Sequence, residues 1–129
     1  MGVKKPVFVV QEHHATHLHW DFRLELDGVL KSWAVPKEPP LEPGTKRLAI
    51  QVDDHALDYA KFEGEITGGY GKGTVKIWDS GDYEMESRKE KKMVFILHGR
   101  KMQGKYVLLK FEKAKSGWLL FKKDDAGKD

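Results

Sequence analysis

Residues 17–26, His-Leu-His-Trp-Asp-Phe-Arg-Leu-Glu-Leu, alternate strictly between ionisable and apolar side chains. Successive side chains of a β-strand point to opposite faces, so this run predicts a strand with one buried and one polar face. Asp27-Gly28 follows directly and is a hairpin turn signal. Residues 29–35, Val-Leu-Lys-Ser-Trp-Ala-Val, then fit the returning strand. An antiparallel hairpin is therefore the first predicted unit of the fold.

Short runs rich in β-branched and aromatic residues continue along the chain. They predict strands at 7–10, 47–52, 74–78, 93–97, 105–111 and 118–122. Between them, the prolines of 36–43 mark a loop, 55–62 fits one or two helical turns, the glycine-rich stretch 64–73 fits a turn or bulge, and the polar stretch 87–92 predicts a loop or hairpin tip. Eight or so short strands favour a mainly β fold, a single-domain antiparallel β-barrel-like structure over residues 1–129, with a sandwich as the related alternative. The pattern does not give the strand order.

The composition excludes several classes of protein. A length of 129 residues fits one domain. The absence of cysteine excludes disulfide scaffolds, thiolate metal sites and cysteine nucleophiles. No apolar run approaches the roughly 18 residues of a membrane span, and the N-terminus lacks a signal-peptide pattern, so we expect a cytoplasmic domain without a membrane partner.

Charge is distributed unevenly along the chain. Residues 1–87 carry 10 basic and 15 acidic side chains, a net of −5, whereas residues 88–129 carry 13 basic and 5 acidic side chains, a net of +8. A basic second half suits a polyanion such as nucleic acid. An ordinary lysine-rich surface explains the same asymmetry, so charge alone leaves both interpretations open.

The polar face of the 17–26 strand carries the first candidate site. His19, Asp21 and Arg23 point the same way because strand side chains repeat with period 2. His13 ends the preceding strand, where a tight bend would bring it back toward His19. Two imidazoles and a carboxylate form a three-ligand set for a divalent metal, and Arg23 beside them could clamp a phosphate oxygen. His17, on the same face, is a candidate to contact substrate or support a ligand, whereas the neighbouring His14 should diverge.

A second cluster lies in residues 53–59. If this stretch is a helical turn, His55 and Tyr59 share a face and could donate hydrogen bonds to a phosphate or move a proton to a leaving oxygen. A capped turn with Tyr59 in the core is the structural alternative. Lys37 and Arg47 flank the proline-rich loop and could add charge to an anion site. Among the aromatic residues, Trp33 or Tyr70 could stack on a base.

Three stretches together carry a family resemblance: Phe-Val-Val-Gln-Glu-His at 8–13, Leu-His-Trp-Asp-Phe-Arg-Leu-Glu-Leu-Asp-Gly at 18–28, and Lys-Ser-Trp-Ala-Val-Pro-Lys at 31–37. With Asp-Asp-His-Ala-Leu-Asp-Tyr at 53–59, Phe-Glu-Gly at 62–64 and residues 73–79, they resemble the 3′-phosphoesterase domain of bacterial DNA ligase D. The resemblance covers nearly the whole chain in order and spacing, and we therefore expect a stand-alone member of that family. It implies a β-barrel-like fold and a manganese-dependent enzyme that heals DNA 3′ ends in non-homologous end joining, removing a 3′-terminal ribonucleoside and then the 3′-phosphate to leave a 3′-hydroxyl.

The resemblance also implies roles for individual residues. It implies metal ligation by His13, His19 and Asp21, phosphate binding by Arg23, Arg47, His55 and Lys37, and catalytic roles for His19, Arg23, His55 and Tyr59. Asp53 stands where the family often has Glu, and His17 where it usually has a basic residue, so neither receives a firm role. Mn²⁺ is the expected cofactor, with Zn²⁺ or Co²⁺ possible at the same site. Expected partners are DNA 3′ ends and, as separate proteins, a ligase, a polymerase or an end-binding protein.

Two rival interpretations use the same residues. His19 and Asp21 with a distant His98 imitate the facial triad of iron-dependent oxygenases, although the chain is short for such an enzyme. Alternatively, the domain is a non-catalytic DNA-end-binding module of an end-joining complex. Turnover that is lost in His19→Ala while DNA affinity survives separates an enzyme from such a module.

Overall fold

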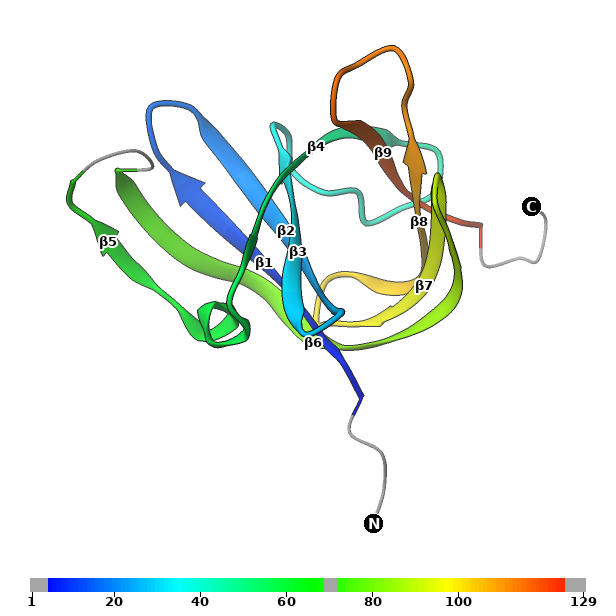
Figure 1. Cartoon of the computed structure of the whole chain (residues 1–129), viewed down its shortest axis with the longest axis horizontal. Helices are drawn as coiled ribbons and strands as arrows, with labels where there is room; N and C mark the ends of the chain where they lie inside the picture. Colours follow the sequence, from blue (N-terminus) through cyan, green and yellow to red (C-terminus); the bar gives the residue numbers. More distant parts are fainter. Residues whose placement is uncertain (1–4, 69–71, 125–129) are drawn as a thin grey trace.

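A computed structural model describes residues 5–68 and 72–124 (Figure 1). The chain is built almost entirely from antiparallel strands, with one short 3₁₀ helix among these residues. The elements in chain order are β1 (Val7–His14), β2 (Leu18–Leu26), β3 (Val29–Val35), β4 (Lys46–His55), η1 (Leu57–Lys61), β5 (Gly64–Ile66), β6 (Gly73–Lys89), β7 (Lys92–His98), β8 (Gln103–Lys110) and β9 (Gly117–Lys122). The predicted mainly β class and the short helical turn are confirmed.

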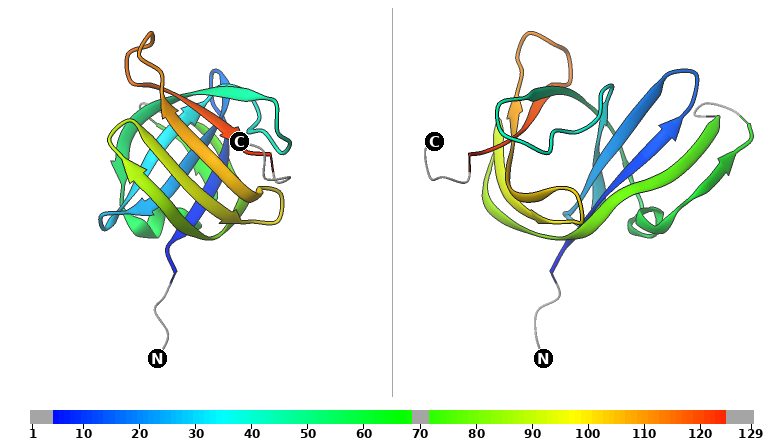
Figure 2. Two further views of the ribbon diagram at one scale, coloured as in Figure 1. Left: turned by 90° about the vertical axis from the view of Figure 1, so that its right-hand side faces the viewer. Right: turned by 180° about the vertical axis from the view of Figure 1, so that it is seen from behind.

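Eight of these strands close into a barrel. The hydrogen-bonded order is β1-β2-β3-β4-β9-β8-β7-β6, and β6 returns to pair with β1. The short β5 adds to β6 outside this ring. Figure 2 shows the long β6 bending from the barrel wall out to β5. Pairing between the first strand and one that begins 59 residues after β1 ends has no local signature, which is why the sequence did not reveal it.

The hairpin of β2 and β3 forms as the alternation predicts. Phe22 and Leu24 point into the barrel and are fully buried. Asp27 and Gly28, at the turn, both have positive φ, 56° and 80°, as a tight two-residue hairpin turn requires. The core behind them is aromatic and aliphatic, and its largest fully buried side chains include Trp33, Tyr83, Tyr106, Phe8, Phe95 and Leu108.

β6 is far longer than predicted. The expected strand at 74–78 runs on to Lys89, so Ser87, Arg88 and Lys89 pair with β7 and only Glu90 and Lys91 form the hairpin tip. The prediction of a loop or hairpin tip over 87–92 is therefore confirmed only for Glu90 and Lys91 and was wrong for residues 87–89 and for Lys92, which lie in strands. The polar side chains of residues 87–89 face solvent from the outer side of the barrel. A shift of register after Met85 lets the long strand bend.

A buried carboxylate holds the turn between β7 and β8. Asp79 accepts hydrogen bonds from the backbone N–H groups of Arg100, Lys101 and Met102, at 2.8, 3.1 and 2.8 Å. Asp79→Ala is expected to lower the free energy of unfolding by about 3 kcal/mol, because these donors lose a charged acceptor. Denaturant titration measures the loss. Asp82→Ala, at an exposed position of the same strand, is the control, and equal stability of the two variants would contradict the role of Asp79.

Candidate metal and phosphate site

Three side chains on the outer face of β1 and β2 converge as predicted. Donor atoms of His13, His19 and Asp21 all lie within 4.8 Å of one another. Asp21 Oδ2 is 3.7 Å from His13 Nδ1 and 3.4 Å from His19 Nε2, and the two imidazole rings meet at 4.8 Å between centroids. His13 and Asp21 are buried, whereas His19 is partly exposed. The site is thus closed at His13 and Asp21 and open to solvent at His19.

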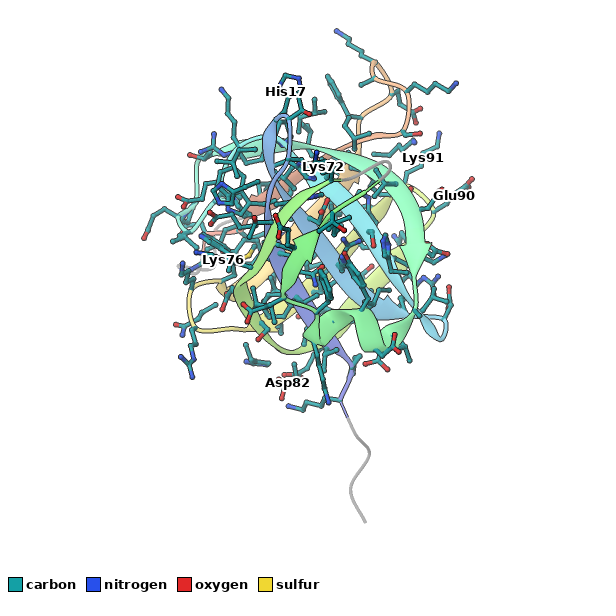
Figure 3. The ribbon with its side chains drawn as sticks, turned by 90° about the vertical axis from the view of Figure 1, so that its left-hand side faces the viewer. His17, Lys72, Lys76, Asp82, Glu90 and Lys91 are labelled. Carbon is teal, nitrogen blue, oxygen red and sulfur yellow. The ribbon has the colours of Figure 1, made fainter. Side chains whose placement is uncertain are left out.

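The strand register explains this convergence. His13 pairs directly with His19, and Gln11 pairs with Asp21, so their side chains share one face of the sheet. The hairpin between β1 and β2 supplies the tight bend that the prediction required. His14 diverges to the opposite face and bonds Glu12, also as predicted. His17 lies exposed at the hairpin tip (Figure 3), and its backbone oxygen lies 3.0 Å from His19 Nδ1.

The donor set fits a divalent cation. His19 Nδ1 lies 3.0 Å from the backbone oxygen of His17, so Nδ1–H donates to that carbonyl and the Nε2 lone pair turns toward Asp21. Metal-ligating histidines are commonly oriented by such a bond. Neutral nitrogens and a carboxylate oxygen suit manganese, zinc or cobalt.

Acidification is expected to weaken metal binding at this site. The hydrogen bond to Asp21 raises the pKa of His19 above 6.5, against the opposing effect of burial. A metal must displace that proton, so the apparent affinity should fall about tenfold for each pH unit below the raised pKa. Calorimetric titration with Mn²⁺ at pH 8 and pH 6 measures this. His98→Ala, which removes a histidine bonded to Glu84, should keep the same pH dependence; equal wild-type affinity at both pH values would exclude His19 as a ligand.

Arg23 is the centre of the neighbouring network. It is 3% exposed, and its Nη2 lies 3.4 Å from Asp21 Oδ2. Its Nε donates to Gln11 Oε1 at 2.6 Å and its Nη1 donates to Ser32 Oγ at 2.8 Å. These bonds hold the planar guanidinium in one orientation, the arrangement that suits recognition of a phosphate.

His55 and Tyr59 complete the site, although not through helical spacing. His55 ends β4 and Tyr59 lies in η1, and their rings meet at 4.7 Å. Arg23 Nη1 is 3.1 Å from His55 Nδ1. Because a guanidinium only donates, Nδ1 accepts, and the proton of neutral His55 sits on Nε2; the backbone oxygen of Asp53, 3.2 Å from the same Nδ1, is then a contact and not an acceptor.

Electrostatics keep both rings neutral near pH 7. Burial, reinforced by the charge of Arg23, lowers the pKa of His55. Burial raises the pKa of Tyr59, whose ring lies 5.0 Å from the Arg23 guanidinium carbon. Neutral His55 and neutral Tyr59 are both available as hydrogen-bond donors toward an anion.

Gln11 belongs to the site but received no role from the sequence. It is fully buried, accepts from Arg23, and donates through Nε2 to the backbone oxygens of Tyr59 and Phe62 at 2.9 and 3.2 Å. It therefore ties η1 to the arginine. The sequence could have indicated Gln11, because it lies two residues before His13 and strand side chains two residues apart share one face.

Lys37 and Arg47 come together beside a separate pocket. With Pro36, Lys46 and Leu48 they line a cavity of about 250 Å³. Arg47 Nε donates to the backbone oxygen of Glu38 at 2.8 Å. Lys37 lies two residues beyond Val35, which pairs with Trp20 next to His19, so this pocket is at the same end of the sheet as the metal-ligand set.

Two further candidates, Trp33 and His98, lie away from this site. Trp33 is buried in the barrel, so the expectation that it could stack on a base was wrong. Tyr70 lies outside the described residues. His98, the third member of the rival oxygenase triad, ends β7 and bonds Glu84 at 2.7 Å, while the cluster with metal-binding spacing among the described residues uses His13. The side chain of Asp53 is exposed.

A closed β-barrel that carries a candidate three-residue metal cluster beside a buried arginine has groups suited to phosphate chemistry. The family described as the DNA ligase D 3′-phosphoesterase domain matches residues 11–110. This chain belongs to that family, as the resemblance of its motifs predicted.

The chain is similar in sequence to part of several longer proteins. The chain is 49% identical over 126 residues to the multifunctional non-homologous end joining protein LigD of Pseudomonas aeruginosa, covering 92% of this chain and 15% of the relative. It is 50% identical over 108 residues to the LigD DNA repair protein of Mycobacterium tuberculosis, covering 80% of this chain and 14% of that protein. The LigD protein of Mycolicibacterium smegmatis is 43% identical over 130 residues, with coverages of 92% and 17%. The chain thus spans about one sixth or less of the length of these relatives.

Proposed function

We propose that this chain is a metal-dependent phosphoesterase that heals DNA 3′ ends, removing a 3′-terminal ribonucleoside and then the remaining 3′-phosphate to leave a 3′-hydroxyl for repair. The observation that carries the proposal is the position of Arg23, a buried and fully oriented cation, next to His13, His19 and Asp21. A binding module gains phosphate affinity from surface cations alone, whereas this arrangement holds a metal-ligand set and an arginine at one point. Membership in the family and the end-joining names of its relatives support the DNA substrate.

His13, His19 and Asp21 are the proposed ligands of Mn²⁺, which when bound supplies Lewis-acid stabilisation to a phosphate oxygen. Arg23 then donates to the phosphoryl oxygens, and its oriented charge stabilises the transition state by a few kcal/mol. His55 presents its Nε2–H and Tyr59 its hydroxyl as further donors, to a phosphate oxygen or to the leaving oxygen. Lys37 and Arg47, at the same end of the sheet, bind neighbouring phosphates of the DNA strand.

The test uses a 5′-labelled primer–template with one 3′-terminal ribonucleotide, incubated with the protein and Mn²⁺. Stepwise conversion to a 3′-phosphate and then a 3′-hydroxyl, lost with EDTA and in His19→Ala, is the expected result. An unchanged primer with intact DNA binding would overturn the proposal in favour of an end-binding module. For the described part of the chain, no helix has the length and apolar character needed to cross a membrane.

A further inference from the structure

The outer face of the sheet continues from the phosphate site onto β3 and β4. Ala34 pairs with Asp21 on one side and with Ile50 on the other. One row further along, Ser32 pairs with Arg23 and with Val52. Directly opposed residues share a face of an antiparallel sheet, so the apolar side chains of Ala34, Ile50 and Val52 extend the surface that carries Asp21 and Arg23.

This apolar surface is accessible and close to the phosphate site. Val52 is 38% exposed, and Ala34 and Ile50 are partly exposed, so all three side chains are accessible to solvent. Neighbouring strands lie about 4.8 Å apart, which places the backbone of Ile50 about 10 Å from that of Asp21. A nucleoside joined through its 5′ oxygen to a phosphate at Asp21 and Arg23 covers a distance of this order.

The helix η1 closes one side of the site. Gln11 binds the backbone of η1, and Tyr59 covers Arg23. Figure 3 looks onto the strands that carry the site, with β5 and β6 on one side, β4 on the other and η1 below. On the side of β3 and β4, the outer face next to Asp21 and Arg23 carries the apolar side chains of Ala34, Ile50 and Val52.

The two surfaces next to the site differ in charge, and this difference indicates which part of a substrate each one suits. The pocket of Lys37, Lys46 and Arg47 is cationic and suits the polyanionic strand that remains after the reaction. The terminal nucleoside carries no phosphate besides the one being cleaved. From this we infer, on the basis of the proposed function, that Ala34, Ile50 and Val52 form the binding surface for the leaving 3′-terminal nucleoside, which we name the nucleoside surface.

The nucleoside surface acts in only one of the two proposed reactions. In the first, water forms a new bond to phosphorus, the bond between phosphorus and the nucleoside's 5′ oxygen breaks, and that oxygen takes the proton. In the second, water attacks the 3′-phosphate and the DNA 3′ oxygen leaves as the hydroxyl. Because no nucleoside lies beyond the phosphate in the second reaction, a defect of this surface must slow the first reaction selectively.

Ile50→Ser tests this selectivity, with Ile96→Ser as its matched control. Ile96 is likewise a partly exposed isoleucine within a strand, but it lies on β7. We expect Ile50→Ser to slow removal of a 3′-terminal ribonucleoside about tenfold, as loss of apolar contact in a binding pocket does, and to leave hydrolysis of a 3′-phosphate on the same primer unchanged. Ile96→Ser should change neither rate. Val52→Ser, at the more exposed position, repeats the test with less effect on folding.

A binding measurement gives a readout that does not depend on turnover. Calorimetric titration in Mn²⁺ compares 5′-CMP, a phosphate carrying a nucleoside on its 5′ oxygen, with inorganic phosphate. Wild type should bind 5′-CMP more tightly, and Ile50→Ser should lose that advantage. An equal loss of both reactions in Ile50→Ser, a loss of neither, or an unchanged preference for 5′-CMP overturns the nucleoside surface. A wild-type protein that processes neither primer overturns the proposed function instead, and the titration still decides whether the surface binds nucleosides.

Discussion

Asp21→Asn is expected to lower phosphoesterase activity about a thousandfold in the presence of Mn²⁺. Asp21 is the one carboxylate in the candidate metal cluster, and its Oδ2 lies within 3.7 Å of both His13 Nδ1 and His19 Nε2. Asparagine keeps the size of the side chain but removes the negative charge that attracts a divalent cation. A metal at such a site contributes several kcal/mol of transition-state stabilisation, and about 4 kcal/mol corresponds to a thousandfold change in rate.

Two measurements separate this result from a folding defect. The melting temperature should show that Asp21→Asn is folded, and calorimetry should show that it no longer binds Mn²⁺. Asp27→Asn makes the same replacement in the exposed hairpin turn, where asparagine also tolerates the positive φ of 56°, and should keep both binding and activity. Unaltered Mn²⁺ affinity in Asp21→Asn would show that the metal lies elsewhere.

The hairpin of β2 and β3 and the convergence of His13, His19 and Asp21 could be predicted because their signals are local. Strict alternation over residues 17–26 places Asp21 and Arg23 on one face and Phe22 and Leu24 on the other, and the structure has the same division. The Asp27-Gly28 turn then sets the register with β3. His13 needed only a short hairpin to reach His19, and Ala15 and Thr16 with His17 provide it.

The features that escaped prediction depend on contacts between distant segments. Closure of the barrel joins β1 to β6, and the network of Gln11 joins β1 to η1, 48 residues away. The length of β6 was missed because its outer side chains are polar along Ser87 to Lys89, a composition that resembles a loop until β7 pairs with it. The contact between His55 and Tyr59 was predicted correctly but for the wrong reason. The prediction relied on helical spacing, whereas His55 lies at the end of β4 and only Tyr59 lies in η1.

Arg23→Lys is expected to cost both activity and stability. Lysine keeps the charge but cannot reach Gln11, Ser32 and Asp21 together, because it presents one compact ammonium instead of a planar fork. The amide oxygen of Gln11 would lose its donor within a fully buried site. We expect the free energy of unfolding to fall by about 2 kcal/mol and activity to fall about a hundredfold.

Arg88→Lys is the matched control for this substitution. Arg88 is also held by side-chain partners, since both of its terminal nitrogens bind the carboxylate of Asp27, but both side chains are about half exposed. An exposed pair contributes little, so this variant should retain its activity and its stability. Similar losses in the two variants would mean that burial of the Arg23 network makes no difference. A large loss in Arg23→Lys alone, seen both in denaturant titration and in turnover, would instead mean that the buried network holds the phosphate-binding group in place.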